Sequence, residues 1–401
     1  MSELLAYFNK KNKTFYSDDP YTISVLRRAY YGKIQKSVLY LDLIEVFYLT
    51  EMRNLIVKDD TSLSELTVNE LLYLASNIRH FFTLYYAYRD WRERGLIINF
   101  SKCFETENKQ IQVEYPTANE IILPKNKIQG FFFIHDAMTI CEQNDVSEYL
   151  YSNYWFGQLG SYKNWQRGTF LKLDAYETIY LQERGILELV NVKERELFEK
   201  LLKKIKDFKI LYEVYSEWRN LGYVIKTGFK FGTHFRVYLP DAKPSDSESQ
   251  YVHSTHVLHC IPENVNIQIS DLSRAIRVAH SVKKTFILAI PSKRSVKVNE
   301  SNQKIANDVL LYHVYTRKES NSDSNFLSSS SREEYLLCSF HEDDSVNGHT
   351  LELLISQAKE IGKNLIFAIV DRETSVTYYL VKKLILHGSK FNYYELEWIQ
   401  P

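Results

Sequence analysis

The chain has 401 residues, enough for roughly two to four compact domains, and its 50 basic and 50 acidic side chains leave no net formal charge. A neutral chain gives no overall sign of nucleic-acid binding, so any RNA contact must come from a local basic patch. The four cysteines lie far apart without a C-x-x-C pair, which argues against a zinc ribbon or a disulfide framework and fits a reducing cytoplasm. No signal peptide is recognisable, and no apolar run reaches the roughly 18 residues of a membrane span.

An internal repeat organises the chain. LDLIEVFYLTE (residues 41–51) matches LDAYETIYLQE (residues 173–183) at an offset of 132 (173 − 41). LYYAYRDWRERGLII (residues 84–98) matches LYEVYSEWRNLGYVI (residues 211–225) at an offset of 127 (211 − 84). In the second pair, a stretch of helical period carries Trp-Arg and is followed by a glycine and an apolar run. This pattern predicts a long helix, a glycine stop and entry into a strand.

The repeat divides the chain into modules. Residues 1–100 form a small α/β module, here called N-type, and residues 101–126 form a tether with some strand character. A second N-type module spans residues 127–200 and continues into a C-type module at residues 201–295. Residues 296–401 form another C-type module. The middle pair is one complete unit, and the outer pair is able to dock as a second, split unit.

The second N-type copy carries a longer loop than the first. This loop, QLGSYKNWQRG (residues 158–168), mixes Lys163 and Arg167 with a tyrosine and a tryptophan. Cations and aromatic side chains on one loop suit single-stranded RNA. The alternative is a longer surface loop without a ligand.

The first C-type module carries a chemical set. It consists of a phenol, an imidazole and an ammonium, on Tyr238, His253 and Lys284, with no carboxylate among them. Such a set can take a proton from a hydroxyl, return one to a leaving oxygen and neutralise an oxyanion, as metal-free RNA cleavage at a 2′-hydroxyl requires. A free phenol has a pKa of about 10, so Tyr238 needs a cation such as Lys284 to act as a base.

Three histidines follow the pattern H-x-x-H-x-x-H, at His253, His256 and His259. On a helix this spacing would suit a metal, but VLHCI is typical of a strand, in which His256 faces away from the other two. No carboxylate or cysteine completes a metal shell, so we expect no metal site and no cofactor. His253 alone is the expected general acid, and the other two are expected core or surface residues.

The segment RAIRVAHSVKK predicts a helix that Ser270 or Asp271 caps and that ends at Lys284. Arg274, Arg277 and Lys284 are spaced by three and seven residues, so they share one face. Each cation alone would suit a solvated surface. Together, beside the other two members of the chemical set, they predict a phosphate-binding ridge.

The last C-type module repeats part of the chemical set. LLYHVYTRKES matches FRVYLP and places Tyr315 opposite the phenol, and a later helix-to-strand segment places Lys363 opposite the ammonium. Ser331 or Arg332 stands where the histidine would be. The module is therefore expected to have the same fold without cleaving, because its general acid is missing.

These blocks resemble the archaeal tRNA-splicing endonuclease family, in its fused three-unit type. The resemblance rests on GYVIKTGFKFGTHFRVY (residues 222–238), on His-Ser before an apolar strand and on RAIRVAHSVKK, in the order of the family. It implies an α/β (α+β) fold, with tandem small N-type α/β modules and restriction-endonuclease-like C-type modules that have mixed central sheets. It also implies Tyr238 as general base, His253 as general acid and Lys284 as transition-state stabiliser.

The resemblance further implies a cytoplasmic enzyme that cuts precursor tRNA at a bulge-helix-bulge without metal, leaving 2′,3′-cyclic phosphate and 5′-hydroxyl ends. Because four units assemble in that family, it implies a homodimer. It implies that Arg277 clamps an unpaired base by stacking. It also implies that an acidic loop at Glu342, Asp343 and Asp344 enters a neighbouring unit, the alternative being a solvated turn.

Two other classes of function stay open on the sequence. One is a non-catalytic RNA-binding or structural subunit built from the same modules, which the complete set of Tyr238, His253 and Lys284 disfavours. The other is a His-dependent metallonuclease, which sensitivity to a chelator would distinguish.

Overall fold

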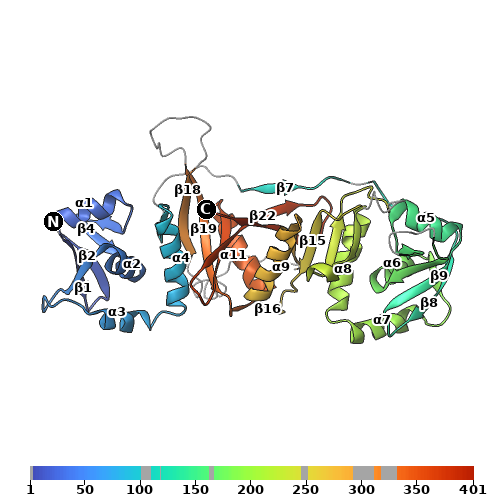
Figure 1. The fold of residues 1–401 in the computed structure, drawn as a ribbon, viewed down its shortest axis with the longest axis horizontal. Helices are drawn as coiled ribbons and strands as arrows, with labels where there is room; N and C mark the ends of the chain where they lie inside the picture. The colour runs from blue at the N-terminus through green and yellow to red at the C-terminus, as the bar shows by residue number, and fades with distance from the viewer. Residues whose placement is uncertain are drawn as a thin grey trace.

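The computed structural model describes residues 3–100, 110–117, 119–161, 167–244, 252–291, 311–317 and 332–401. The molecule is elongated, and its four modules follow one another along the long axis (Figure 1). The two C-type modules lie side by side in the middle, with the first N-type module at one end and the second at the other. The expected mixed α/β architecture is confirmed. Among the described helices, none has both the length and the apolar character that crossing a membrane demands.

The first N-type module is a five-stranded sheet with helices packed on it. In spatial order its strands are β3 (Lys33–Gln35), β4 (Val38–Leu41), β2 (Thr14–Ser17), β1 (Leu4–Asn9) and β5 (Leu55–Asp59). Its helices are α1 (Pro20–Arg28), α2 (Leu43–Arg53) and α3 (Val68–Ala75). Helix α2 begins with a capping box between Asp42 and Glu45, which satisfies free N–H groups at the helix start.

The second N-type module has the same strand order. Its strands are β10 (Gln158–Leu159), β11 (Phe170–Asp174), β9 (Met138–Glu142), β8 (Ile128–Phe133) and β12 (Leu187–Leu189). Its helices are α5 (Asp145–Tyr154), α6 (Ala175–Glu183) and α7 (Glu194–Lys204). Asp174 and Glu177 form the capping box of α6, at the positions that Asp42 and Glu45 hold in α2. The internal repeat is therefore confirmed as a repeated fold.

One continuous sheet runs through both C-type modules. In spatial order its strands are β13 (Val224–Thr227), β14 (Phe235–Tyr238), β15 (His256–Cys260), β17 (Thr285–Ile290), β23 (Asn392–Ile399), β22 (Val376–Ile385), β21 (Asn364–Val370), β19 (Arg332–His341), β18 (Leu311–Arg317) and β6 (Ile97–Asn99). The helices of this region are α4 (Phe81–Glu93), α8 (Phe208–Asn220), α9 (Ile269–Ser281) and α11 (Gly348–Glu360). Strands β16 (Asn266–Gln268) and β20 (Ser345–Asn347) pair with each other and link the two modules.

The predicted succession of helix, glycine and strand is confirmed in both copies. Helices α4 and α8 end at glycines with left-handed backbone, Gly95 (φ 75°) and Gly222 (φ 83°). A residue with a side chain rarely adopts this conformation, which explains the glycine at each stop. The tryptophans of the repeat, Trp91 and Trp218, are fully buried.

The arginine of each Trp-Arg pair attaches its helix to an N-type module. Arg92 donates hydrogen bonds to the carbonyl oxygens of Ala29 and Tyr30, both at 2.9 Å. Arg219 donates to the carbonyl oxygen of Tyr154, also at 2.9 Å. These carbonyl groups lie at or just after the ends of α1 and α5, where a cation is favourable. The repeated dipeptide is therefore a docking contact between modules.

The split unit is completed within one chain. Strand β6 pairs with β18, with Ile97 opposite Tyr315, just as β13 pairs with β14, with Val224 opposite Tyr238. Helix α4 and strand β6, which the sequence analysis assigned to the first N-type module, thus pack with the last C-type module. Strand β6 is short, and Ile98 becomes fully buried only through this distant pairing, which local periodicity does not reveal.

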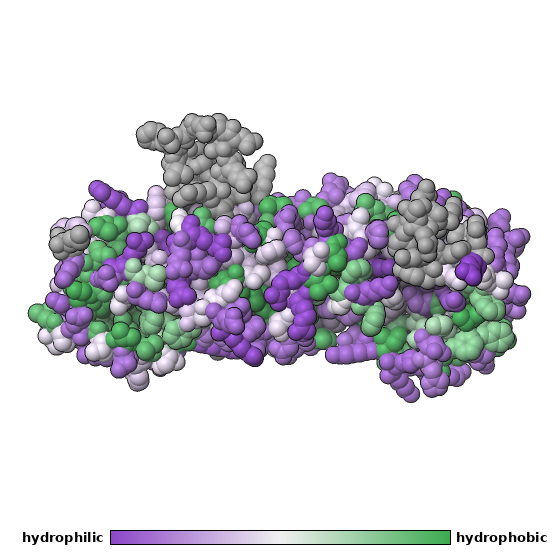
Figure 2. Space-filling view, viewed as in Figure 1, coloured by the Kyte–Doolittle hydropathy of each residue, from purple (hydrophilic) through white to green (hydrophobic). Residues whose placement is uncertain are grey.

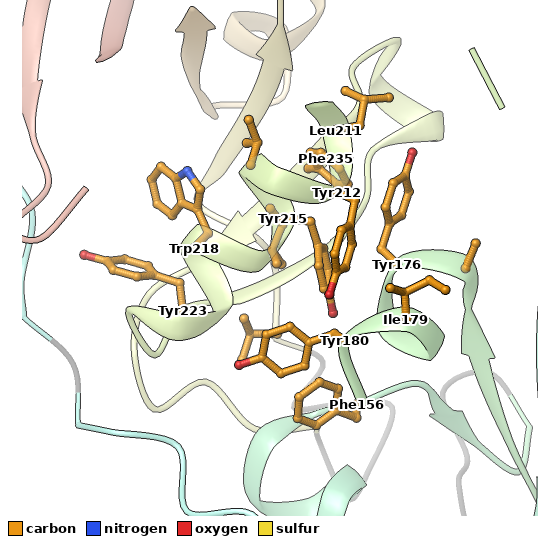
Figure 3. Close-up of a cluster of buried hydrophobic side chains, with 14 of the residues drawn as sticks. Phe156, Tyr176, Ile179, Tyr180, Leu211, Tyr212, Tyr215, Trp218, Tyr223 and Phe235 are labelled. Carbon is orange, nitrogen blue, oxygen red and sulfur yellow. The ribbon is translucent and has the colours of Figure 1, made fainter. Parts of the chain in front are cut away.

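Aromatic side chains fill the junction between the second N-type module and the first C-type module (Figure 3). The ring of Tyr215 on α8 lies 5.7 Å from that of Tyr176 and 6.0 Å from that of Tyr180, both on α6. Such pairs contribute about 0.5–1.5 kcal/mol each beyond the burial of their area. The junction therefore holds the N-type module in a defined orientation beside the chemical set.

Exposed hydrophobic side chains gather at the end of the molecule that the second N-type module forms (Figure 2). Phe131, Phe133 and Phe170 on its sheet are about half exposed. The central part of the visible face is more mixed, with hydrophilic side chains between smaller hydrophobic areas.

The described part of the tether is bound to the central sheet. Strand β7 (Gln112–Glu114) pairs in parallel with β22, which confirms the predicted strand character. The hydroxyl of Tyr115 donates to Glu395 at 2.6 Å, and the hydroxyl of Tyr223 donates to the carbonyl oxygen of Pro116 at 2.6 Å.

Candidate active site

Three adjacent strands bring the chemical set to one place. Strand β14 runs antiparallel to β15, and β15 runs parallel to β17. The end of β14 and the starts of β15 and β17 therefore share one edge of the sheet. Tyr238 is the last residue of β14, Lys284 immediately precedes β17, and His253 lies shortly before β15. The register thus gathers the three predicted residues at this edge.

Tyr238 is almost fully buried, with 1% of its surface exposed. Its ring lies 4.7 Å from the ring of Trp155, which belongs to the second N-type module. The guanidinium of Arg236, two residues earlier on β14, lies 5.8 Å from the centre of the Tyr238 ring. A cation beside the ring is the kind of partner that a phenolate requires.

Lys284 is anchored to the backbone beside His253. Its amine donates a hydrogen bond to the carbonyl oxygen of Ser254, the residue that follows His253. Burial, and then the charge of Arg236, lower the pKa of Lys284. The side chain of His253 is exposed. The site therefore holds a half-buried amine next to an accessible imidazole.

The other histidines of the H-x-x-H-x-x-H pattern have a different environment. Burial, and then the charge of Lys284, lower the pKa of His256 to about 4. Burial, and then the nearby His234, lower the pKa of His259 to about 3. Both imidazoles are neutral at neutral pH, so neither is the imidazolium that a general acid requires there. Within the described residues, no group of three or more His, Cys, Asp or Glu side chains is arranged to hold a metal ion.

The start of α9 differs from the sequence prediction. Ser270 and Asp271 do not cap it, because the helix already begins at Ile269 without a side-chain cap. The N–H groups of Ile269 and Ser270 donate instead to the carbonyl oxygens of Asp344 and Glu342, at 2.9 and 3.0 Å. A turn of the last C-type module thus supplies the acceptors that a local side chain was expected to supply.

The end of α9 also lies earlier than expected. The helix stops at Ser281, and Lys283 adopts a left-handed backbone with φ 54°. This turn leads the chain directly into β17, so Lys284 lies beyond the helix rather than on its last turn.

The acidic segment makes its contacts inside the chain. Glu342 accepts a hydrogen bond from the backbone N–H of Arg372 at 3.2 Å, and Asp343 pairs with the Arg372 guanidinium at 2.7 Å. Asp344 accepts from the backbone N–H of His341 at 2.7 Å. These contacts fit a turn, and the backbone of this turn also orients the start of α9. Entry of the segment into a neighbouring unit stays a prediction.

The structure describes three of the four cations that are expected to contact RNA. Arg274 and Arg277 are exposed on α9, and Arg274 pairs with Asp271 at 3.2 Å. Arg167 is exposed at the end of the longer loop. Lys163 lies outside the described residues. Contact of these cations with RNA stays a prediction.

A related cluster lies in the last C-type module. The pairs β15–β17 and β19–β21 share one register at an offset of 79 residues (335 − 256 and 364 − 285). This offset places Lys363 at the position of Lys284. It places Arg332, rather than Ser331, at the position of His253.

The carboxylate of Glu334 occupies the centre of this cluster, which we call the relic site. Glu334 is fully buried and pairs with the amine of Lys363 at 2.7 Å. It is also hydrogen-bonded to Nδ1 of His313 at 2.7 Å, and it accepts from the hydroxyl of Tyr315 at 3.3 Å. The lysine that could stabilise an oxyanion is therefore neutralised within the chain.

A cleft of about 370 Å³ adjoins Lys284 between α9 and β23. It is lined from both C-type modules, and its Trp398 is 39% exposed. Sequence reasoning missed Trp398, because its proximity to the site depends on the β17–β23 pairing. It also missed Arg236, for which a signal existed: Arg236 precedes Tyr238 by two positions on a strand, so both point to the same face.

Two family models match the chain. The model described as tRNA intron endonuclease, catalytic C-terminal domain, matches residues 208–299. The model described as tRNA intron endonuclease, N-terminal domain, matches residues 11–75 and 134–202, one range in each N-type module. The chain belongs to the tRNA intron endonuclease family. It is therefore an endoribonuclease, and the resemblance drawn from its motifs is confirmed.

Individual relatives of this endonuclease are proteins named tRNA-splicing endonuclease. That of Pyrococcus abyssi is 32% identical over 193 residues, which cover 47% of this chain and 96% of the relative. That of Pyrobaculum islandicum is 35% identical over 170 residues, covering 40% and 89%. That of Methanococcoides burtonii is 34% identical over 164 residues, covering 39% and 43%.

Proposed function

We propose that this endonuclease cuts precursor tRNA at the bulge-helix-bulge junctions between exon and intron. The observation that supports the proposal is the shared edge of β14, β15 and β17, at which Tyr238 ends one strand and His253 and Lys284 precede the other two. The names of the relatives support tRNA as the substrate. The contrast with the relic site disfavours a purely structural role, because only one copy retains the histidine.

The proposed chemistry is an intramolecular transfer. The phenolate oxygen of Tyr238 takes the proton of the 2′-hydroxyl, and the 2′-oxygen forms a bond to the adjacent phosphorus. The bond from phosphorus to the 5′-oxygen breaks, and His253 gives its proton to that oxygen. The ammonium of Lys284 stabilises the charge on the phosphorane oxygens. The products are a 2′,3′-cyclic phosphate and a 5′-hydroxyl.

Cleavage should proceed at an unchanged rate in excess chelator, because the three side chains supply the base, the acid and the positive charge. The measurement is single-turnover cleavage of a bulge-helix-bulge RNA by the purified chain, in EDTA and monovalent salt. Native electrophoresis of the RNA controls for its own metal-dependent folding. Activity that is lost in chelator and returns only with a divalent metal, while the RNA fold stays intact, would contradict the proposal.

We further propose that the enzyme acts as a homodimer. One chain supplies two N-type and two C-type modules but one complete chemical set, while the substrate has two bulges separated by a short helix. A symmetric dimer supplies the second site and lets each site face one bulge.

Sedimentation equilibrium at assay concentrations should therefore give the mass of two chains. Mixing the parent with an excess of His253→Ala chains should yield hybrid dimers with one working site, which cut each RNA once. Singly cut RNA should then accumulate in proportion to the hybrid fraction. A monomer that cuts both junctions would overturn the two-site account.

A further inference from the structure

A cavity of about 320 Å³ lies beside Tyr238, between the second N-type module and the first C-type module. Side chains of both modules line it, among them Trp155, Gln158, Lys172, Lys226, Thr227 and Arg236. Ligand sites in proteins begin at roughly 300 Å³, so the cavity is large enough for a single nucleotide.

One side of the cavity is a fixed polar surface. The amine of Lys226 pairs with Glu177 at 2.6 Å and donates to the carbonyl oxygen of Gly157 at 2.9 Å. Glu177 also accepts from the N–H of Gly157 at 2.8 Å, while Asp174 caps α6. Both carboxylates are thus engaged by protein groups, which keeps this surface rigid without a ligand.

Arg236 lies where the cavity meets the chemical set. Its guanidinium is close to the ring of Tyr238, and its Nε is buried without a hydrogen-bond partner among the described residues. A buried guanidinium N–H with no acceptor costs free energy, which an acceptor on a ligand would recover. Trp155, which contacts Tyr238, adds an aromatic wall to the same space.

The strands that carry the relic site provide an internal comparison. Lys226 and Arg236 face each other across β13 and β14, and the equivalent pair across β6 and β18 is Asn99 and His313. His313 is hydrogen-bonded to Glu334. Both cations are therefore present beside the complete chemical set and replaced beside the set that has lost its histidine. Because Lys226 is already engaged by Glu177 and Gly157, this difference points to Arg236 as the cation that is available to the reaction.

We propose that this cavity is a subsite for one unpaired nucleotide of the substrate, adjacent to the cleaved phosphodiester. Arg236 donates to an oxygen of that nucleotide, with its phosphate as the strongest acceptor, and Trp155 packs against the base. The inference rests on the proposed function, since it gives one bulge nucleotide a place in that site.

The test combines RNA and protein changes in a His253→Ala background, in which binding is measured without cleavage. Bulge-helix-bulge RNAs with one abasic nucleotide at each bulge position in turn are titrated by fluorescence anisotropy. Thr227 is exposed at the end of β13 and lines the cavity, so Thr227→Trp fills it from an edge strand. Glu188→Trp, on the exposed face of the edge strand β12, is the matched control.

One abasic position should weaken binding about tenfold, on the scale of a lost base stack. That penalty should disappear in Thr227→Trp and persist in Glu188→Trp. Arg236→Met should weaken binding of all the RNAs, and Arg236→Lys should restore part of the loss. Penalties unchanged by Thr227→Trp would overturn the subsite and leave the proposed function intact. An absence of binding to every bulge-helix-bulge RNA would instead overturn the proposed function, and the subsite with it.

Discussion

Replacing His253 with alanine should slow single-turnover cleavage by at least about a hundredfold, the usual scale for removing a general acid. In the proposed mechanism this imidazole protonates the leaving 5′-oxygen, which otherwise departs as an alkoxide.

The matched controls are His256→Ala and His259→Ala, which should lose far less activity once folding is verified by circular dichroism. Burial lowers the pKa values of these histidines to about 4 and 3, so neither is the imidazolium that a general acid requires near neutral pH. Comparable losses in all three variants would instead support a metal site built from the three histidines.

Replacing Lys363 with alanine should lower the free energy of unfolding by about 3–5 kcal/mol, because it leaves the buried carboxylate of Glu334 without its ion-pair partner. The cleavage rate of the folded variant should match that of the parent, since the relic site lacks a general acid. Urea unfolding and single-turnover cleavage well below the unfolding midpoint measure the two effects separately. The double variant Glu334→Leu with Lys363→Met, which removes both charges together, should recover most of the stability.

Lys284→Ala is the matched control, because Lys284 holds the equivalent position and is only half buried. It should show the opposite result, a large loss of rate with a small loss of stability. A loss of rate in folded Lys363→Ala as large as that in Lys284→Ala would show that the active and relic sites were assigned the wrong way round.

Short sequence patterns predicted much of the fold and the residues of the chemical set. The repeated Trp-Arg before a glycine predicted two helix ends, and Gly95 and Gly222 adopt the left-handed backbone that such an end requires. The alternation of FRVY predicted the strand that ends at Tyr238. These inferences succeeded because helix stops and strand faces are set by residues only a few positions apart.

Contacts between distant segments decided the rest. Ile98 and Val314 are 216 residues apart (314 − 98) and pair between β6 and β18. Because of this pairing, α4 and β6 pack with the last C-type module and not with the first N-type module to which the sequence analysis assigned them. The acceptors for the start of α9 come from the turn at residues 341–344, so no local capping signal could have identified them.

By itself, the sequence determined the repeat, the order of the modules and the family to which Tyr238, His253 and Lys284 belong. Only the tertiary structure showed that Glu334 neutralises Lys363 in the relic site. It also showed that Arg236 and Trp155 border a cavity beside Tyr238. The physical reason is that charge pairing and burial depend on which strands become neighbours. Strand neighbours are selected by hydrogen bonding and packing over the whole chain, which the period of one segment does not record.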